Sequence, residues 1–257
     1  MVSSINTDQI TCGNFTGWKA YWNDYLFNKY GKQEVESESD LFFQVARTVS
    51  QNPIGRSVFE YIIDDIIEKM ALAKEDVLVD FCCGNGLFTY ELRDQVSRII
   101  GVDFAPQIIQ TANAFKCAAN INYYQNDVIG FLKNFKRQFP GIRPNKYLNN
   151  DSLAYFSIKD LAQILQLIVS ISGKDFCFLL RGVPNTDLMW NFYNTEERKE
   201  KYYGDISNGD YSNGGLGNWW APGDIERVCT RLNLKCHIQP QNDLLSNYRM
   251  DVIIGDS

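Results

Sequence analysis

The sequence predicts an α/β fold built on a seven-stranded, mostly parallel sheet with helices on both faces. From Val77 onward, short apolar runs alternate with helical patterns, which is typical of a parallel sheet. The last two runs, "KCHIQPQ" and "YRMDVII", lie only a few residues apart and indicate a late antiparallel strand. Because 257 residues with 45% apolar content can enclose one sizeable core, we expect a single domain over residues 1–257.

The segment ahead of the sheet is expected to be helical. "TGWKAYWNDYLFNKY" places aromatic side chains at i, i+3 and i+4, as in Trp18, Tyr21 and Trp22, the pattern of an amphipathic helix. "SVFEYIIDDIIEKMAL" repeats the pattern with aliphatic residues. Between them lies "ESESDLFFQVARTVSQNP", which is charged at first and ends at Pro53.

The sheet itself is expected from five runs followed by the final pair. These runs are "VLVDF", "RIIGVDF", "INYYQND", "KYLNND" and "DFCFLLRG", and helices are expected over 87–96, 106–118, 128–137 and 158–171. An irregular, aromatic-rich insert over 183–221 follows the fifth run; loops of this length are usually functional lids or disordered, and the aromatic content favours an ordered cap. "APGDIERVCTRLN" then predicts a helix with Pro222 in its first turn.

Composition and charge exclude several classes of partner. The formal net charge is −6 and no Lys/Arg block stands out, so we expect no nucleic-acid partner. No apolar run approaches the roughly 20 residues of a membrane span, and the N-terminus lacks a signal-peptide pattern, so we expect no membrane partner. Seven scattered cysteines fit thiols in a reducing compartment. We expect a cytoplasmic protein with a small-molecule partner, while the oligomeric state is not set by the sequence.

The segment "VLVDFCCGNGLF" carries the most informative motif. Gly84 and Gly86 lie between a strand and a helix, where a backbone must approach a ligand closely. A nicotinamide fingerprint needs a third glycine, where the chain has Thr89, and no P-loop ending is present. Adjacent Cys82 and Cys83 lack a metal-ligand spacing, so we expect no metal and interpret them as small buried residues.

This segment resembles the first motif of the class I (Rossmann-like) S-adenosylmethionine (SAM)-dependent methyltransferases, an acid followed by x-G-x-G-x-G. The match falls on Asp80, Gly84 and Gly86, and Cys82 stands where the first glycine is usual. The resemblance extends from Val77 to Ser257. It implies SAM as cofactor, S-adenosylhomocysteine (SAH) as product, and a methionine end lying on the two glycines.

The resemblance also implies the other cofactor contacts. Asp103 follows Asp80 by 23 residues; it would hold the ribose, a logic shared by nucleoside-binding α/β folds, and Phe104 would pack on the adenine. Asp127 would accept from the adenine amino group, with the Val128 amide close by. The alternative for both Asp103 and Asp127 is a helix cap.

Further candidates come from the end of the fourth run and from the N-terminal third. "KYLNNDSLAYFS" would face both SAM and the acceptor, with Asn149 on the cofactor and Asn150 and Tyr155 on the acceptor, although an ordinary turn has the same composition. "DLFFQVARTV" lies where these enzymes often carry a lid, here residues 1–55. Arg47 would pair with the methionine carboxylate and Gln44 lies near it; a solvated helix face is the alternative for each.

The acceptor itself would be contacted from the C-terminal part of the chain. Trp219 and Trp220 precede a helix on the ligand side and would stack on the acceptor or the sulfonium, although large aromatic residues more often belong to a core. Tyr248 and Arg249 begin the last strand at the same edge, with surface polar residues as the alternative. The expected parts are therefore the lid, a SAM-binding half over 56–182, an acceptor cap over 183–221, and a helix and strand pair over 222–257.

The function expected from these residues is methyl transfer from SAM to an oxygen or nitrogen of a small polar metabolite, sugar-like or amino-acid-like. Aligning two bound reactants can supply roughly 7–11 kcal/mol of the barrier, so no nucleophile is required. A hydroxyl acceptor would need a base, for which Asp151, Tyr155 and His237 are candidates. The alternatives are a non-catalytic SAM- or nucleoside-binding module on the same fold, or an NAD-type oxidoreductase.

Overall fold

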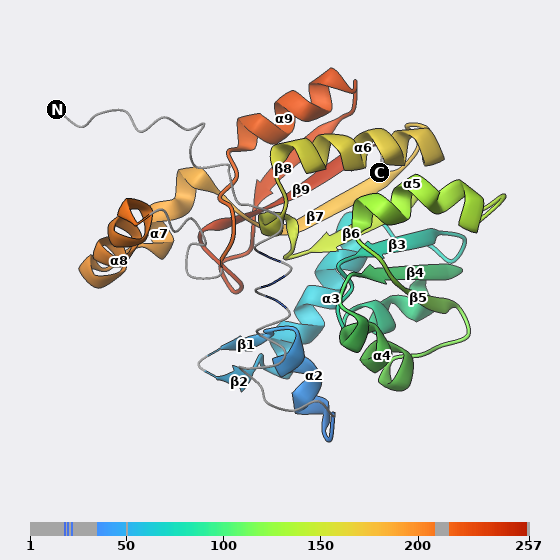
Figure 1. Cartoon of the computed structure of the whole chain (residues 1–257), viewed down its shortest axis with the longest axis horizontal. Coiled ribbons are helices and arrows are strands. Elements are labelled where there is room, and N and C mark those ends of the chain that lie inside the picture. Colours follow the sequence, from blue (N-terminus) through green and yellow to red (C-terminus); the bar gives the residue numbers. More distant parts are fainter. Residues whose placement is uncertain are drawn as a thin grey trace.

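A twisted, mixed sheet forms the centre of the molecule (Figure 1). The computed structural model describes residues 18, 20, 22, 35–49, 51–208 and 216–255. The strands are β1 (Thr48–Val49), β2 (Asn52–Pro53), β3 (Val77–Phe81), β4 (Arg98–Asp103), β5 (Ile121–Gln125), β6 (Lys146–Asn150), β7 (Cys177–Pro184), β8 (Cys236–Pro240) and β9 (Arg249–Gly255). The helices are α2 (Glu38–Gln44), α3 (Arg56–Met70), α4 (Pro106–Phe115), α5 (Val128–Gln138), α6 (Ile158–Ser172), α7 (Met189–Phe192), α8 (Glu196–Ser207) and α9 (Pro222–Arg231). Short 3₁₀ helices are η3 (Thr89–Gln95), η4 (Leu153–Tyr155) and η5 (Thr186–Leu188).

The seven-stranded sheet has the order β5-β4-β3-β6-β7-β9-β8. Its first five strands are parallel, and β9 runs antiparallel to both β7 and β8. The mostly parallel sheet with a late antiparallel strand is therefore confirmed. The chain winds outward from β3 to β5 and then returns to the other side of β3 with β6. Such a switch point opens a crevice at the carboxyl ends of the strands.

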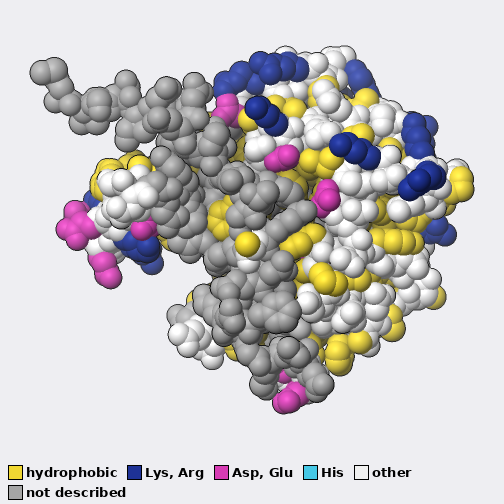
Figure 2. All heavy atoms as spheres, viewed as in Figure 1, with side chains coloured by type: hydrophobic (Ala, Val, Ile, Leu, Met, Phe, Trp, Pro, Cys, Tyr) yellow, Lys and Arg dark blue, Asp and Glu magenta, His cyan; other side chains and the backbone are white. Residues whose placement is uncertain are grey.

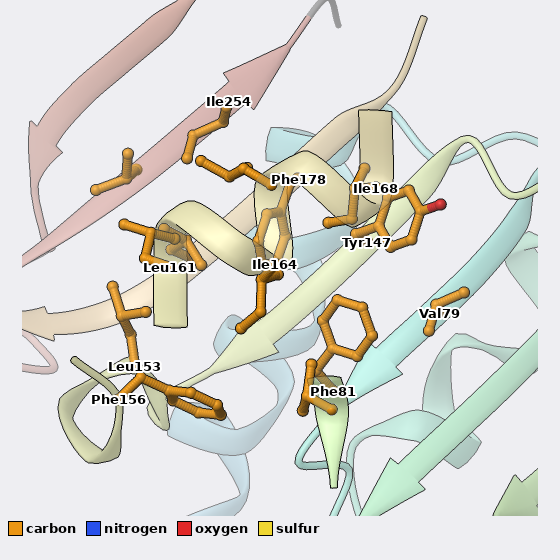
Figure 3. Close-up of a cluster of buried hydrophobic side chains, with 14 of the residues drawn as sticks. Val79, Phe81, Tyr147, Leu153, Phe156, Leu161, Ile164, Ile168, Phe178 and Ile254 are labelled. Carbon is orange, nitrogen blue, oxygen red and sulfur yellow. The ribbon is translucent and has the colours of Figure 1, made fainter. Parts of the chain in front are cut away.

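Helices cover both faces of this sheet, because alternate residues of each buried strand point to opposite sides. Val79 and Phe81 face the layer of α5, α6 and α9, whereas Leu78 packs with α3 and α4. Figure 3 shows Leu161 and Ile164 of α6 lying over the strands on the first face. The predicted helix over 158–171 is thus the amphipathic α6, and a capping box of Ser157 and Asp160 begins it.

α2 and the segment after it lie at the carboxyl edge of the sheet, whereas α3 covers one of its faces. α2 begins with a capping box of Ser37 and Asp40, and β1 and β2 form a small hairpin after it. The expected lid over 1–55 falls partly outside the described residues. Of its first helix the structure describes three residues; Trp18 and Trp22 pack on Tyr155, with ring centroids 4.9 and 5.6 Å apart.

The insert after β7 differs from its prediction. An irregular segment was expected over 183–221, but the structure contains α7 and the 12-residue α8 there, whose ribbons project from the sheet in Figure 1. The Thr195 hydroxyl accepts from the Arg198 amide and caps α8. The sequence did not predict α8, because its highly charged "EERKEK" stretch has almost no apolar face. Its buried Tyr202 packs with Tyr193 and Trp219 in a separate small core.

Candidate active site

A cavity of about 540 Å³ lies at the carboxyl ends of β3, β4 and β6, at the switch point of the sheet. This volume falls within the range of small-molecule sites, roughly 300–1,000 Å³. The glycine turn after β3, the acids after β4 and β5, the segment after β6 and the end of α2 all contribute to its wall. Residues far apart in the sequence therefore meet around one space, as the strand pattern predicted.

The turn after β3 needs an unusual backbone. Cys82, Gly84 and Gly86 have φ angles of 57°, 58° and 78°, in the left-handed region. A Cβ on Gly86 would lie 2.4 Å from the Tyr123 hydroxyl, so only glycine fits there. Cys82 adopts the same region with a side chain, at a cost of roughly 1–2 kcal/mol. That conformation explains why glycine is usual at its position.

Asp80 is buried at the end of β3 and lines the cavity. The Thr89 hydroxyl donates a hydrogen bond of 2.6 Å to its Oδ2. Burial raises the pKa of Asp80 to about 7, and the neighbouring Asp103 carboxylate adds to this, while the Thr89 hydrogen bond acts in the opposite direction. Thr89, which replaces the third glycine of a nicotinamide fingerprint, therefore has a defined partner.

Asp103 and Asp127 follow β4 and β5 and both line the cavity. Asp103 accepts from the backbone amides of Gly84, at 3.2 Å, and Ala105, at 3.0 Å. Burial raises the pKa of Asp103, while these amides act to lower it. Asp127 accepts from the Gly130 amide at 2.8 Å and is the N-cap of α5. Asp127 therefore both caps α5 and lines the cavity.

Asp151 follows β6 and is surrounded by guanidinium groups. It pairs with Arg47 through Oδ2 and with Arg249 through Oδ1, the latter at 2.8 Å. Burial acts to raise the pKa of Asp151, but Arg47, Arg249 and Arg181 outweigh it and lower the pKa below its ordinary value. A carboxylate held ionised in this way is a weak proton acceptor, which argues against Asp151 as a general base.

Most of the predicted residues line the cavity, and six do not. Gly86 and Asn149 are outside its lining, and Trp219, Trp220 and Tyr248 pack in the cores next to the insert. His237 is exposed on the edge strand β8, away from the cavity. The other predicted residues line the cavity and are Gln44, Arg47, Asp80, Cys82, Gly84, Asp103, Phe104, Asp127, Val128, Asn150, Asp151, Tyr155 and Arg249.

Several cavity residues were not predicted. Trp18 and Trp22 were interpreted only as one face of a helix, yet both line the cavity beside Tyr155. Phe88 lies under the Arg47 guanidinium, 5.2 Å from carbon to ring centroid, and Asn85 anchors α2. Asn85 and Phe88 could have been predicted as cavity residues from their position next to the glycine turn. No feature of the sequence indicated that the two tryptophans line the cavity.

Solved structures share this architecture. A SAM-dependent methyltransferase from Anabaena variabilis superposes with a TM-score of 0.58 at 18% identity, covering 98% of this chain and 96% of that one. Geranyl diphosphate C-methyltransferase from Streptomyces coelicolor, solved with Mg²⁺, geranyl diphosphate and SAH, gives a TM-score of 0.58 at 13% identity, covering 94% and 97%. The chain has the class I methyltransferase fold. In this methyltransferase fold the cavity occupies the switch point next to β3.

Sequence relatives point the same way over shorter stretches. An uncharacterized methyltransferase of Schizosaccharomyces pombe is 40% identical over 48 residues, which are 19% of this chain and 18% of that protein. An uncharacterized RNA methyltransferase of Oceanobacillus iheyensis is 28% identical over 109 residues, 42% of this chain and 21% of that protein. The chain thus spans about a fifth of these curated relatives. No family model matches it. Within the described ranges, no helix is long and apolar enough to cross a membrane.

Proposed function

We propose that this protein is a SAM-dependent methyltransferase that acts on a small molecule. The observation that carries the proposal is the convergence of a glycine turn and three acids, Asp80, Asp103 and Asp127, on one cavity at the switch point. Hydroxyl and amino groups of a nucleoside are hydrogen-bond donors, so an array of carboxylates after neighbouring strands suits them. The shared fold and the methyltransferase relatives support the same assignment.

Each part of the cavity then has a proposed partner. Asp103 would accept from the ribose hydroxyls, Phe104 would pack on the adenine, and Asp127 with the Val128 amide would hold the edge of the base. Gly84, which has no side chain, would leave the backbone open to the methionine end, with Cys82 beside it. Arg47 and Gln44 would reach that end from the α2 side; among the described residues, Arg47 Nε has no hydrogen-bond partner.

The chain's own contribution to catalysis would be alignment and exclusion of water. When bound, SAM supplies an electrophilic methyl group on a sulfonium, with a neutral thioether as the leaving group. The cavity walls would position the acceptor oxygen or nitrogen against the methyl group, and alignment of two reactants can supply roughly 7–11 kcal/mol. An acceptor hydroxyl or ammonium would pass its proton to a base; Tyr155 lines the cavity, whereas His237 does not.

The charge distribution supports a small acceptor, sugar-like or amino-acid-like, over RNA, although some curated relatives are named RNA methyltransferases. The chain carries a net charge of −6. On the face shown in Figure 2, lysine and arginine side chains gather along the upper and right margins, over α9, α6 and α5. The tips of β3, β4 and β6 point away from that margin (Figure 1). On this face, the lysine and arginine side chains along that margin therefore lie away from the tips of these strands.

Calorimetry with SAH tests the cofactor site. We expect Asp103→Asn to weaken SAH binding at least tenfold, about 1.4 kcal/mol, because an amide cannot accept from two ribose hydroxyls with a full charge. Asp94→Asn is the matched control, since the Asp94 side chain is 72% exposed. Unchanged SAH affinity in Asp103→Asn would contradict the site, and no SAH binding by the wild type would contradict the function.

Turnover separates the enzyme from a non-catalytic binding module on the same fold. Incubation with methyl-labelled SAM and a small-metabolite extract should yield a labelled small product, whereas a binding module yields none. Label recovered in added RNA instead would contradict the small-molecule acceptor. For an NAD-type oxidoreductase, mixing with NADH would enhance its fluorescence, and we expect no change.

A further inference from the structure

A chain of buried ion pairs runs from the cavity wall into the sheet. At the wall, Asp151 pairs with Arg47 and Arg249, and Arg181 lies 4.0 Å from it. Arg181 also pairs with Asp65, at 3.1 Å. Arg47 comes from the segment after α2, Asp151 follows β6, and Arg249 begins β9, so three distant parts of the chain supply these groups.

The chain of ion pairs ends deeper in the protein. Lys69 of α3 bonds Asp65 at 2.7 Å and Asp251 of β9 at 2.6 Å. The connected groups are four cations, Arg47, Arg249, Arg181 and Lys69, and three carboxylates, Asp151, Asp65 and Asp251. Their side chains are at most 22% exposed. Among the described residues, this network therefore holds one more cation than carboxylates, while Asp103 and Asp127 line the same cavity. An anion bound beside Arg249 would offset the excess in this poorly solvated place.

A hydrogen-bond donor of Asn150 lies at the same place. Asn150 is 7% exposed and lines the cavity. Its Oδ1 accepts from Arg181 Nη1 at 3.3 Å, while its Nδ2 has no partner within the part of the chain that the structure describes. Buried polar groups of folded proteins almost always have partners. A ligand that gave Asn150 Nδ2 a partner would have to offer an acceptor atom.

The methionine end of SAM does not remove this surplus charge. Its ammonium and carboxylate groups cancel, and the sulfonium adds a further positive charge. A second ligand with one negative charge would restore the balance. A carboxylate brings one charge, whereas a phosphate monoester brings about −1.5 to −2. The planar fork of a guanidinium such as that of Arg249 also matches a carboxylate.

Flat aromatic walls lie beside these groups. The cavity is lined there by Trp18, Trp22 and Tyr155. The Tyr155 ring centroid lies 4.9 Å from that of Trp18, in a tilted contact, and 5.6 Å from that of Trp22, in an edge-on contact. We propose that the acceptor is a small carboxylic acid with a flat apolar body, anchored through its carboxylate by Arg249 and Asn150 and covered by the two tryptophans. This inference rests on the proposed function, because it assigns the second reactant of the same cavity.

Calorimetry with the SAH-saturated protein tests it, with benzoate as the probe. We expect benzoate to bind at least tenfold more tightly than its neutral isostere benzamide, and more tightly than phenyl phosphate. Arg249→Gln, saturated with SAH in the same way, should remove the preference for benzoate over benzamide. Arg249→Lys, which keeps the charge but not the fork, should retain part of the preference. Arg227→Gln is the control, since Arg227 is 66% exposed on α9.

The outcomes separate this inference from the function on which it rests. Equal binding of benzoate and benzamide, or tighter binding of phenyl phosphate, would overturn it while SAH binding stands. Competition between benzoate and SAH would also overturn it, because the anion site would then belong to the cofactor's own carboxylate. A wild type that binds no SAH would overturn both. If Arg249→Gln does not fold, the benzoate and benzamide affinities of the wild type and of Arg249→Lys still test the inference.

Discussion

Asn85 and Leu41 connect the glycine turn to the segment that precedes the sheet. Asn85 Nδ2 donates to the Leu41 carbonyl oxygen at 2.8 Å and to Gln44 Oε1 at 3.0 Å. Asn85 is fully buried, and the two partners lie in α2, more than 40 positions earlier in the chain. The turn and the wall supplied by α2 are therefore one unit, and disturbance of either should reach the other.

We expect Asn85→Ala to loosen α2 and weaken SAH binding. The substitution leaves a buried carbonyl without a donor, which costs roughly 1–3 kcal/mol. Hydrogen exchange should rise over residues 38–47, and calorimetry should show a loss of SAH affinity. Asn134→Ala is the matched control, because Asn134 bonds only the Gly130 carbonyl within its own helix. Equal exchange over 38–47 in the two variants would argue against the link.

A second prediction concerns the backbone of the turn. Gly86→Ala places a Cβ 2.4 Å from the Tyr123 hydroxyl at a φ of 78°. Left-handed strain costs roughly 1–2 kcal/mol and overpacking a further 1–3. Chemical denaturation should show this loss of stability. Gly204→Ala in α8 meets nothing within 4 Å and should stabilise the protein slightly. An equal change in the free energy of unfolding of the two variants would contradict the geometry of the turn.

The third prediction concerns pH. The pKa of Asp80 is raised to about 7 in the folded state from an ordinary 3.8, so between these values the native protein holds a proton that the unfolded chain has released. The stability from this group is complete below about pH 4 and is lost as the pH rises to about 7. Across that window, wild-type stability should fall relative to Asp80→Asn by about 1.4 kcal/mol per pH unit.

Urea unfolding from pH 4 to 8 measures this difference. Subtracting the curve of Asp80→Asn removes the titration of the other groups, which both proteins share. Asp94→Asn provides the control, because its exposed side chain should leave the wild-type curve unchanged. Parallel curves for the wild type and Asp80→Asn would show that Asp80 keeps an ordinary pKa.

The parallel strands and the helices between them could be predicted because their signal is local. Runs such as "VLVDF" and "RIIGVDF" are mostly apolar, as strands buried on both faces are. Once those strands lie side by side, the residues after them must share one edge. The position of Asp103 beside Gly84 follows from this geometry.

The insert and its tryptophans could not be predicted in the same way. α8 has little apolar periodicity, so a highly charged segment concealed a helix. Trp219 and Trp220 lie just before a helix on the ligand side, but the side chains of both are buried in hydrophobic cores. A large aromatic side chain follows whichever apolar surface it can bury, and the local sequence does not specify that surface.

The sequence by itself therefore determined the order of strands along the chain, the glycine turn and the acids that follow β3, β4 and β5, because each depends on neighbours a few residues away. Only the tertiary structure decided the state of Asp151, whose partners Arg47 and Arg249 lie 104 and 98 positions away. A carboxylate after a strand has the same local sequence whether it is a base or the centre of an ion-pair chain. The difference arises from the charges that folding brings around it.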